Sequence, residues 1–169
     1  MKLSREKKNV LILVVYLTVF PIVTLLIGSV IGKPLTKIEA SNINFLLKAF
    51  GIENYLIGNQ IYIPADRMSF EITWQCSGVF SMTLYTLIYL LLPGLKRKPI
   101  EWMFGVSTIY IVNILRVFFS IYLYHRVGEG VFNLFHYTIG PILLFLLVVL
   151  LVAHAFLLGL KSSGESHKF

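Results

Sequence analysis

The sequence predicts an all-α integral membrane bundle of about four transmembrane helices, with a small extracytoplasmic helix and β-hairpin segment between the first two. Of the 169 residues, 57% are hydrophobic and only 14% are charged, whereas soluble domains have about 25% charged residues. The apolar residues also stand in long stretches that are nearly free of charge, and about 20 apolar residues suffice to cross a bilayer core. We therefore predict a single membrane domain over residues 1–169.

The four predicted transmembrane helices cover residues 10–32, 77–95, 100–124 and 131–160. The first apolar stretch exceeds the roughly 7 to 15 residues of a secretory signal peptide, and no small-x-small cleavage site follows it. We therefore expect a retained helix, bent at Pro21.

Residues 33–75 are mostly polar and are predicted to lie outside the hydrocarbon core. Within them, apolar residues between 43 and 50 recur at i, i+3, i+4 and i+7. This spacing predicts a short amphipathic helix that is capped by Ser41 or Asn42 and ends at Gly51.

The rest of this outer segment is predicted to contain short strands. Residues 55–57 and 60–63 flank Gly58 and Asn59, a pair suited to a hairpin turn. Apolar and polar residues then alternate over 69–75, which predicts a half-buried strand that leads directly to the next helix. The sequence leaves open whether these elements only pack on the bundle or also guide a substrate.

The positions of lysine and arginine predict the orientation, because such residues in short loops stay preferentially in the cytoplasm. The N-terminus, the second connection and the C-terminal tail fall on one side, and they hold Lys2, Arg5, Lys7, Lys8, Lys96, Arg97, Lys98, Lys161 and Lys168. On the other side the basic residues are balanced by Glu39, Glu53, Asp66, Glu71 and Glu129. We predict a multi-pass protein of the plasma membrane with both termini cytoplasmic.

The net charge of +7 follows from this basic rim, which lies beside anionic lipid headgroups. Membrane lipids are therefore expected partners, and nucleic acids are not. A single cysteine excludes an intramolecular disulfide, and the sequence lacks the Cys/His cluster of a structural zinc site. It also lacks a Gly-rich phosphate loop and a dinucleotide fingerprint, so we predict no metal and no cofactor.

The lone cysteine, Cys76, stands at the predicted start of the second helix and is followed by Ser77 and Gly78. A thiol at a helix N-terminus experiences the positive end of the helix dipole, which favours the thiolate. The position suits a nucleophile. Considered alone, however, a single cysteine in a membrane protein is more often a small buried hydrophobic residue.

Arg116 interrupts an otherwise uncharged helix, about 12 Å below its outer end at about 1.5 Å per residue. Its insertion costs about 2.5 to 3.5 kcal/mol unless it faces a partner or a polar interior, so a functional role is the default expectation. A structural arginine bound to carbonyls or to a headgroup is the alternative. Asn113 lies three residues earlier, on the same face of the helix, and can orient the guanidinium.

His136 is predicted to lie about five residues, or roughly 7.5 Å, inside the outer end of the last helix. A lone helical histidine usually packs, but this depth matches that of Arg116 and Cys76. His125, in the outer loop region, is the competing candidate, whereas His154 and His167 belong to the cytoplasmic side. A thiol, an imidazole and a cation at one end of a bundle are the groups that acyl transfer requires.

At these residues the sequence resembles the exosortase and archaeosortase family of membrane transpeptidases. The resemblance rests on Cys-Ser-Gly at 76–78, Asn-Ile-Leu-Arg at 113–116 and Phe-His at 135–136, and it covers roughly residues 70–140. Many bacterial members have several additional spans, so the chain is most similar to the compact, largely archaeal forms.

The resemblance implies a thiol protease and transpeptidase that acts on exported proteins. Such an enzyme recognises a C-terminal sorting signal, made of a short motif, a transmembrane helix and a basic cluster, and cuts near the motif on the outer face. Carried over, Cys76 would be the nucleophile, His136 the proton-transfer residue and Arg116 the cationic stabiliser. In the archaeal branch the released acyl group passes to a lipid headgroup.

A second hypothesis comes from a different class of protein. The chain could be a non-enzymatic membrane subunit in which Arg116 binds an anionic lipid or substrate and Cys76 is inert. Replacement of Cys76 by alanine separates the two hypotheses, because only the enzyme requires the thiol.

Overall fold

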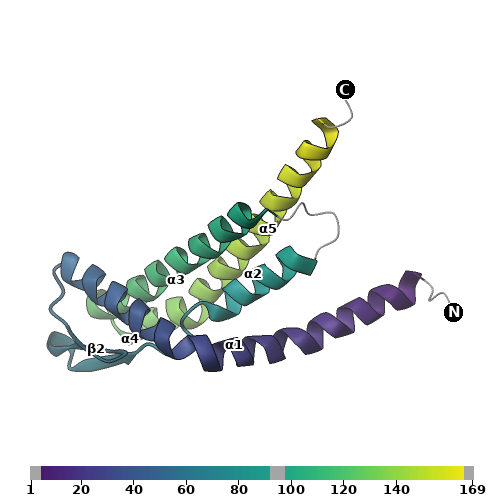
Figure 1. The fold of residues 1–169 in the computed structure, drawn as a ribbon. Helices are drawn as coiled ribbons and strands as arrows, with labels where there is room; N and C mark the ends of the chain where they lie inside the picture. The colour runs from purple at the N-terminus through teal and green to yellow at the C-terminus, as the bar shows by residue number, and fades with distance from the viewer. Residues whose placement is uncertain (1–4, 92–97, 166–169) are drawn as a thin grey trace.

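The computed structural model describes residues 5–91 and 98–165, with side chains placed at 18–32, 34–91 and 98–157. The chain is mainly helical and carries one small sheet (Figure 1). In order, its elements are α1 (Arg5–Ala49), β1 (Tyr55–Ile57), β2 (Gln60–Ile63), the 3-10 turn η1 (Pro64–Asp66), β3 (Met68–Glu71), α2 (Val79–Leu91), α3 (Pro99–Val127), α4 (Glu129–Leu134), the π-helical segment η2 (Phe135–Ile139) and α5 (Gly140–Glu165).

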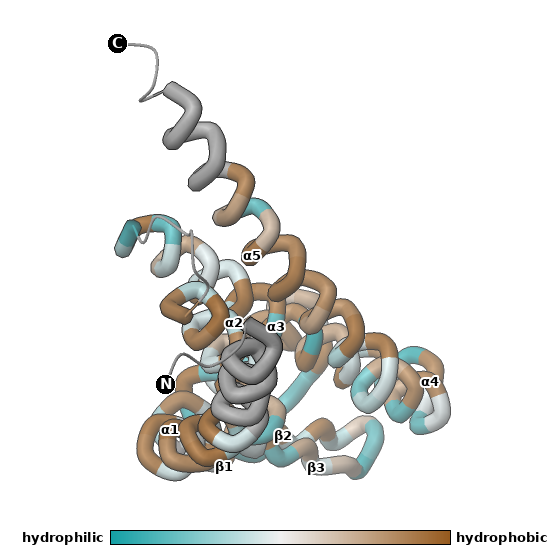
Figure 2. The backbone as a smooth tube through the Cα atoms, turned by 90° about the vertical axis from the view of Figure 1, so that its right-hand side faces the viewer, coloured by the Kyte–Doolittle hydropathy of each residue, from teal (hydrophilic) through white to brown (hydrophobic). Residues whose placement is uncertain are grey.

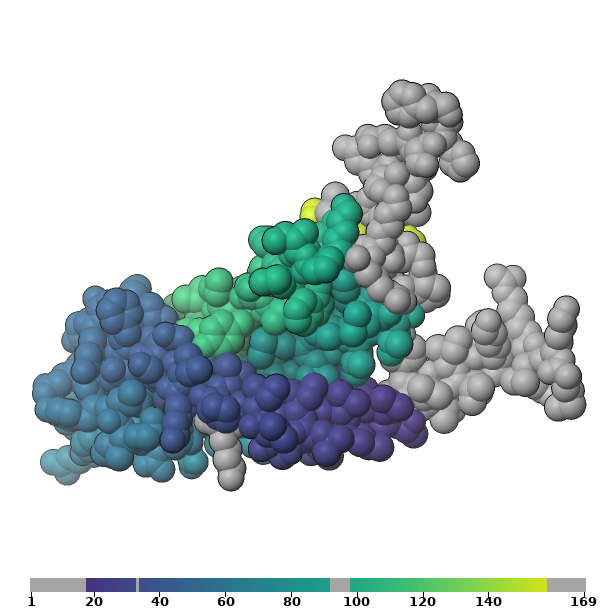
Figure 3. Space-filling model, viewed as in Figure 1, coloured from purple at the N-terminus to yellow at the C-terminus, as the bar shows by residue number. Residues whose placement is uncertain are grey.

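The helices form an elongated bundle with the sheet and α4 at one end (Figure 1). Helix α2 packs against α1, α3 and α5, and α3 also packs against α1 and α5. The space-filling view shows the described part of α1 along one side of the molecule, with the outer segment forming the adjacent end (Figure 3). Helices α1 and α5 both extend toward the opposite end.

The described helices confirm the membrane character but not the number of spans. Two stretches, Pro99–Val127 and Glu129–Leu157, are long and apolar enough to cross a bilayer, and the bent helix α1 can supply a third. The 13 residues described in α2 are fewer than the roughly 17 needed for a span. The rest of the predicted span, residues 92–95, lies outside the described residues. Four spans therefore remain a prediction.

The surface of the bundle is suited to a lipid solvent. Only 39% of the most apolar window of α3, and 22% of that in Glu129–Leu157, is buried inside the protein. Figure 2 shows apolar backbone positions along most of the described length of α5. Soluble monomers rarely expose apolar patches larger than a few hundred Å², whereas hydrocarbon is an apolar solvent for such side chains.

Two predictions about the first helix are wrong. The bend, of 65°, lies between Thr18–Gly32 and Pro34–Ala49 and not at Pro21. No separate cap interrupts the chain at Ser41 or Asn42, because α1 continues to Ala49. The physical reason is that Pro34 lacks an N–H and its ring clashes with the preceding turn, which bends a helix without ending it.

Trp74 packs into the bent region of α1, where two glycines leave room for its side chain. A Cβ atom at Gly28 would lie 2.7 Å from the indole Cε3, and one at Gly32 would lie 2.8 Å from the Trp74 Cβ. The close approach of α1 to this side chain holds the chain just before Cys76 against the first helix.

The end of α1 and the hairpin agree with the prediction. Gly51 has a φ of +78°, and the Ile52 N–H donates to the Leu47 carbonyl at 2.9 Å, as expected for a glycine C-cap. The strands form an antiparallel sheet in the order β1-β2-β3, with a φ of +66° at Gly58 in the turn.

The third strand is shorter than predicted, since β3 ends at Glu71 and not at Gln75. The next residue is anchored to the hairpin, because the Ile72 N–H donates to the Asn59 carbonyl at 2.9 Å. Residues 74–78 then form a turn. Buried residues of the sheet share one core with α1 and α3, which includes Ile43, Leu47, Ile61, Ile63, Phe118 and Ile121.

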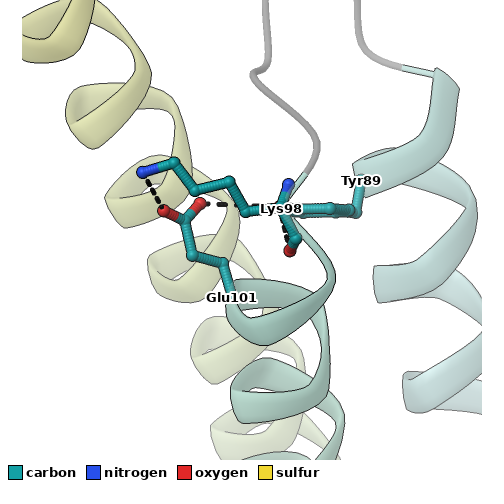
Figure 4. A network of polar contacts seen from close by, with 3 residues as sticks. All are labelled: Tyr89, Lys98 and Glu101. Atoms are coloured by element: carbon teal, nitrogen blue, oxygen red, sulfur yellow. Dashed lines mark hydrogen bonds and ion pairs between the residues drawn. The ribbon is translucent and has the colours of Figure 1, made fainter.

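At the opposite end of the bundle, polar contacts join α2 to the start of α3 (Figure 4). The Tyr89 hydroxyl donates to the Lys98 carbonyl at 3.1 Å and accepts from the Lys98 N–H at 3.0 Å. Lys98 also pairs with Glu101 at 3.0 Å. The sheet and Lys98 therefore lie at different ends of the bundle.

Candidate active site

The chain reaches Cys76 through a turn and not through the first turn of a helix. The Cys76 N–H donates to the Thr73 carbonyl at 3.0 Å, and the Ser77 N–H donates to the Trp74 carbonyl at 3.3 Å. Helix α2 begins only at Val79, because Gly78 has a φ of +68° and interrupts helical geometry. Helix α2 thus begins two residues later than predicted, so Cys76 lies in the turn, three residues before Val79, and the dipole effect weakens outside the first turn.

The structure brings Cys76 and His136 together. The Cys76 Sγ lies 3.6 Å from the His136 Nε2, and the Thr73 hydroxyl donates to the same sulfur at 3.5 Å. The predicted last helix begins at Glu129 and contains a π-helical segment that carries His136. Single π turns inside helices occur frequently at functional sites because they re-aim one side chain.

Aromatic rings hold the imidazole in place. His136 stacks on Phe132 with ring centroids 5.1 Å apart and meets the edge of Tyr137 at 4.9 Å. Its Nδ1 is buried and has no hydrogen-bond partner within the described chain. The side chain is therefore oriented by packing, and no carboxylate completes a triad among the described residues.

The geometry separates the competing histidines. His125 Nδ1 lies 2.8 Å from the Asp66 carboxylate, so it ties the end of α3 to η1. It does not line the cleft that contains Cys76. His154 lines a separate cavity with Glu101, toward the other end of the bundle. His167 lies outside the described residues.

Arg116 and Asn113 hold the backbone of the candidate nucleophile. The Asn113 amide donates to the Cys76 carbonyl at 2.8 Å, and the Arg116 Nη2 donates to the same oxygen at 3.3 Å. Asn113 is 1% exposed, and Gly78 leaves space for it, since a Cβ there would lie 2.9 Å from its Cγ. Ser77 supports the turn, because its hydroxyl donates to the Trp74 carbonyl at 2.6 Å.

Three structural contributions to the site have no clear signal in the sequence. The first is Glu39 of α1, a buried carboxyl whose oxygens make no hydrogen bond within the described chain. The second is the π-helical segment itself. The third is Gly140, where a Cβ would lie only 2.8 Å from the Arg116 Cγ and Cδ.

Cys76 and His136 open into a cleft of about 500 Å³ that runs along β3. One wall of the cleft comes from the sheet and the turn, and the second wall comes from α3, α4 and η2. The residues of this second wall include Tyr124, Glu129, Phe132, Asn133 and Tyr137. Figure 2 shows β3 on the side of the sheet that faces α4. Both polar and apolar side chains line this cleft.

A smaller cavity of about 200 Å³ lies between α2, α3 and α5. Arg116, Asn113 and Gln75 contribute polar groups to it, and Phe80, Leu84 and Phe145 contribute apolar side chains. Arg116 therefore borders the cavity while it also contacts the Cys76 carbonyl.

Among the described residues, no group of three His, Cys, Asp or Glu side chains lies close enough together to hold a metal ion.

In comparisons with known proteins, the family described as transmembrane exosortase matches residues 5–153. No curated protein and no solved structure matches the sequence.

Proposed function

Since the chain belongs to the transmembrane exosortase family, we propose that it is a cysteine-dependent membrane transpeptidase. It cleaves the C-terminal sorting signal of exported proteins on the outer face and transfers the protein to an acceptor, for which a membrane lipid is the best candidate. The observation that carries this proposal is the 3.6 Å approach of the Cys76 Sγ to the His136 Nε2 in an open cleft.

In the first half-reaction, the Cys76 thiol transfers its proton to His136 and its sulfur attacks the carbonyl carbon of the scissile peptide. A C–S bond forms, and Arg116 stabilises the negative charge that develops on the carbonyl oxygen. The C–N bond then breaks, and His136 returns the proton to the leaving amine. The products are a thioester on Cys76 and the free sorting-signal helix.

In the second half-reaction, His136 removes a proton from the hydroxyl or amine of the acceptor. The acceptor attacks the thioester carbonyl, the C–S bond breaks, and the thiolate recovers its proton from His136. The exported protein is thereby joined to the acceptor by an ester or amide bond. No oxidant and no cofactor enters this sequence of steps.

The edge of the sheet supplies a path for the substrate motif. Among the strands that the structure describes, β3 is paired only with β2, and Ile72 directs its N–H toward the hairpin. Because successive residues of a strand alternate, Ser69 and Glu71 direct their backbone groups toward the free edge. An extended peptide in the cleft can add to this edge as a further strand, with its side chains against Tyr124 and Phe132.

The cavity beside Arg116 supplies a path for a lipid acceptor. Its apolar lining from α2 and α5 suits an acyl chain, and the guanidinium at its polar end suits an anionic headgroup. The substrate helix is expected to dock against the apolar outer faces of the same bundle. Both partners then approach Cys76 from within the membrane, while the sorting motif lies in the cleft.

The decisive experiment is a search for the acyl-enzyme. Purified enzyme is incubated with a protein that carries the sorting signal, and intact-protein mass spectrometry is used to find a hydroxylamine-labile mass increase on Cys76. The adduct is expected to accumulate when the acceptor is absent, and Cys76→Ser should bind substrate but scarcely react. If Cys76→Ala cleaves at the wild-type rate, covalent catalysis is excluded and the non-enzymatic hypothesis, with Arg116 as a lipid site, is preferred.

A further inference from the structure

Glu39 is a carboxylic acid inside a bundle whose other interior residues are mostly apolar. It lies on the face of α1 that packs against α3, together with Ala40, Ile43 and Leu47. Its exposed fraction is 1%. Burial of such a group costs several kcal/mol unless polar neighbours compensate it, so its position on this face requires a partner.

Burial disfavours the ionised form of the Glu39 carboxyl, and the neighbours that oppose this effect are the Asn113 side chain first and the Arg116 guanidinium second. Neither carboxyl oxygen makes a hydrogen bond of standard geometry within the described chain, and the same holds for Asn113 Oδ1 and Arg116 Nε. Glu39, Asn113 and Arg116 thus contribute four buried polar atoms without a partner there, from two helices that pack against each other.

The same two residues of α3 hold the Cys76 carbonyl, at 2.8 Å from Asn113 and 3.3 Å from Arg116. The orientation of the Cys76 peptide determines where its thiol points, and the thiol lies 3.6 Å from His136. A change that lets Asn113 rotate would therefore be transmitted to the sulfur. Glu39 does not line the cleft that contains Cys76, so an effect of Glu39 on the sulfur would act through this pair.

We propose that Glu39 is a positioning residue for the transfer reaction, which braces Asn113 and Arg116 from the first helix so that they hold Cys76 toward His136. The inference rests on the proposed function, and it assigns α1 a part in the chemistry. Hydrogen bonding to Asn113 is the main component, and the charge of the carboxyl is the lesser one.

The test uses the reaction of Cys76 with iodoacetamide in the purified full-length protein. Cys76 is the only cysteine in the chain, so no other thiol contributes to the measured rate, and no sorting-signal substrate is required. Glu39→Gln and Glu39→Leu both remove the titratable carboxyl, but only glutamine can still hydrogen-bond to Asn113. Their comparison therefore isolates the effect of position from that of charge.

We expect Glu39→Leu to be alkylated at least about fivefold more slowly than Glu39→Gln, within the usual range of coupling between neighbouring residues. In an Asn113→Ala background, the two variants should react at the same rate. Asn42→Leu is the matched control, because it removes another α1–α3 hydrogen bond, from Asn42 to the Tyr110 hydroxyl at 3.3 Å. It should react like the wild type.

Equal rates for Glu39→Leu and Glu39→Gln would overturn the inference, as would a difference that persists without Asn113. An equal slowing by Asn42→Leu would reduce Glu39 to a general contact between the helices. These outcomes are independent of the proposed function, which fails separately if Cys76→Ala retains cleavage. Circular dichroism of each variant verifies that the bundle is folded before the rates are compared.

Discussion

Gly140 lies where the π-helical segment joins α5, and its replacement by alanine tests the geometry of the whole site. Its φ of −59° is helical, so alanine is conformationally allowed and gains about 0.5 to 1 kcal/mol of helix propensity. The added methyl group would nevertheless lie 2.8 Å from the Arg116 Cγ and Cδ and 2.9 Å from the Phe135 carbonyl oxygen. The substitution therefore opposes two neighbours at once.

The size of the disturbance follows from these distances. Ordinary contact begins at 3.4 Å, so the Arg116 side chain must retreat from 2.8 Å by about 0.6 Å. The Phe135 oxygen accepts the Gly140 N–H in the π turn, and its movement would shift His136 as well. Overpacking of this kind costs about 1 to 3 kcal/mol, which offsets the gain in helix propensity.

Activity should suffer more than stability. A displacement of about 1 Å near reacting groups can cost about 100-fold in rate, so we expect Gly140→Ala to form the Cys76 adduct about 10 to 100 times more slowly. The assay is single-turnover adduct formation by mass spectrometry, with a thermal melt of the same sample. The melting temperature should change by only a few degrees.

Gly130→Ala is the matched control, because a Cβ at Gly130 in α4 meets nothing within 4 Å. It should gain helix propensity and keep adduct formation within about twofold of the wild type. A wild-type rate for Gly140→Ala would refute the reasoning, since neither the place of Arg116 nor the π turn could then matter for the chemistry.

Three further predictions concern the roles and the orientation of the site. Arg116→Lys should insert and fold but lose most turnover, because an ammonium lacks the planar five-donor geometry of guanidinium. Near-normal turnover of this variant would show that Arg116 serves only as a counter-charge. His136→Ala should slow adduct turnover about 10² to 10⁴-fold, whereas His125→Ala should stay within about threefold, and the reverse order would reassign the base. In a cysteine-free background, a membrane-impermeant thiol reagent should label a reporter cysteine at Glu53 but not at Lys98 in intact cells; the opposite pattern would invert the topology.

Much of the candidate site could be predicted because local sequence carries its signals. Arg116 is conspicuous as a charge within an apolar stretch, and Cys76 is the only thiol. Charge counts in the loops place both at the same end as His136, and the structure brings Cys76 and His136 to 3.6 Å. Their catalytic roles remain predictions that the experiments above decide.

The predictions about the first helix and the third strand failed for one shared reason, which is that local sequence patterns compete with each other. The polar residues after position 33 predict an interruption, yet α1 continues through Pro34 because the helix can bend there and keep most of its hydrogen bonds. The alternation over residues 69–75 predicts a strand to its end, but the chain turns early. The Asn59 side chain and backbone bind Ile72, and a left-handed Gly78 delays the start of α2.

The sequence by itself determined that this protein resides in a membrane, which residues are chemically unusual, and at which end of the bundle they meet. Hydropathy and charge are summed along the chain, so they need no knowledge of contacts between helices. Only the tertiary structure decided that the Glu39 side chain is buried, that Gly140 leaves room for Arg116, and that His136 comes to 3.6 Å from Cys76. Each of these depends on the close approach of segments distant in sequence, and the packing that produces such approaches leaves no periodic pattern in either segment alone.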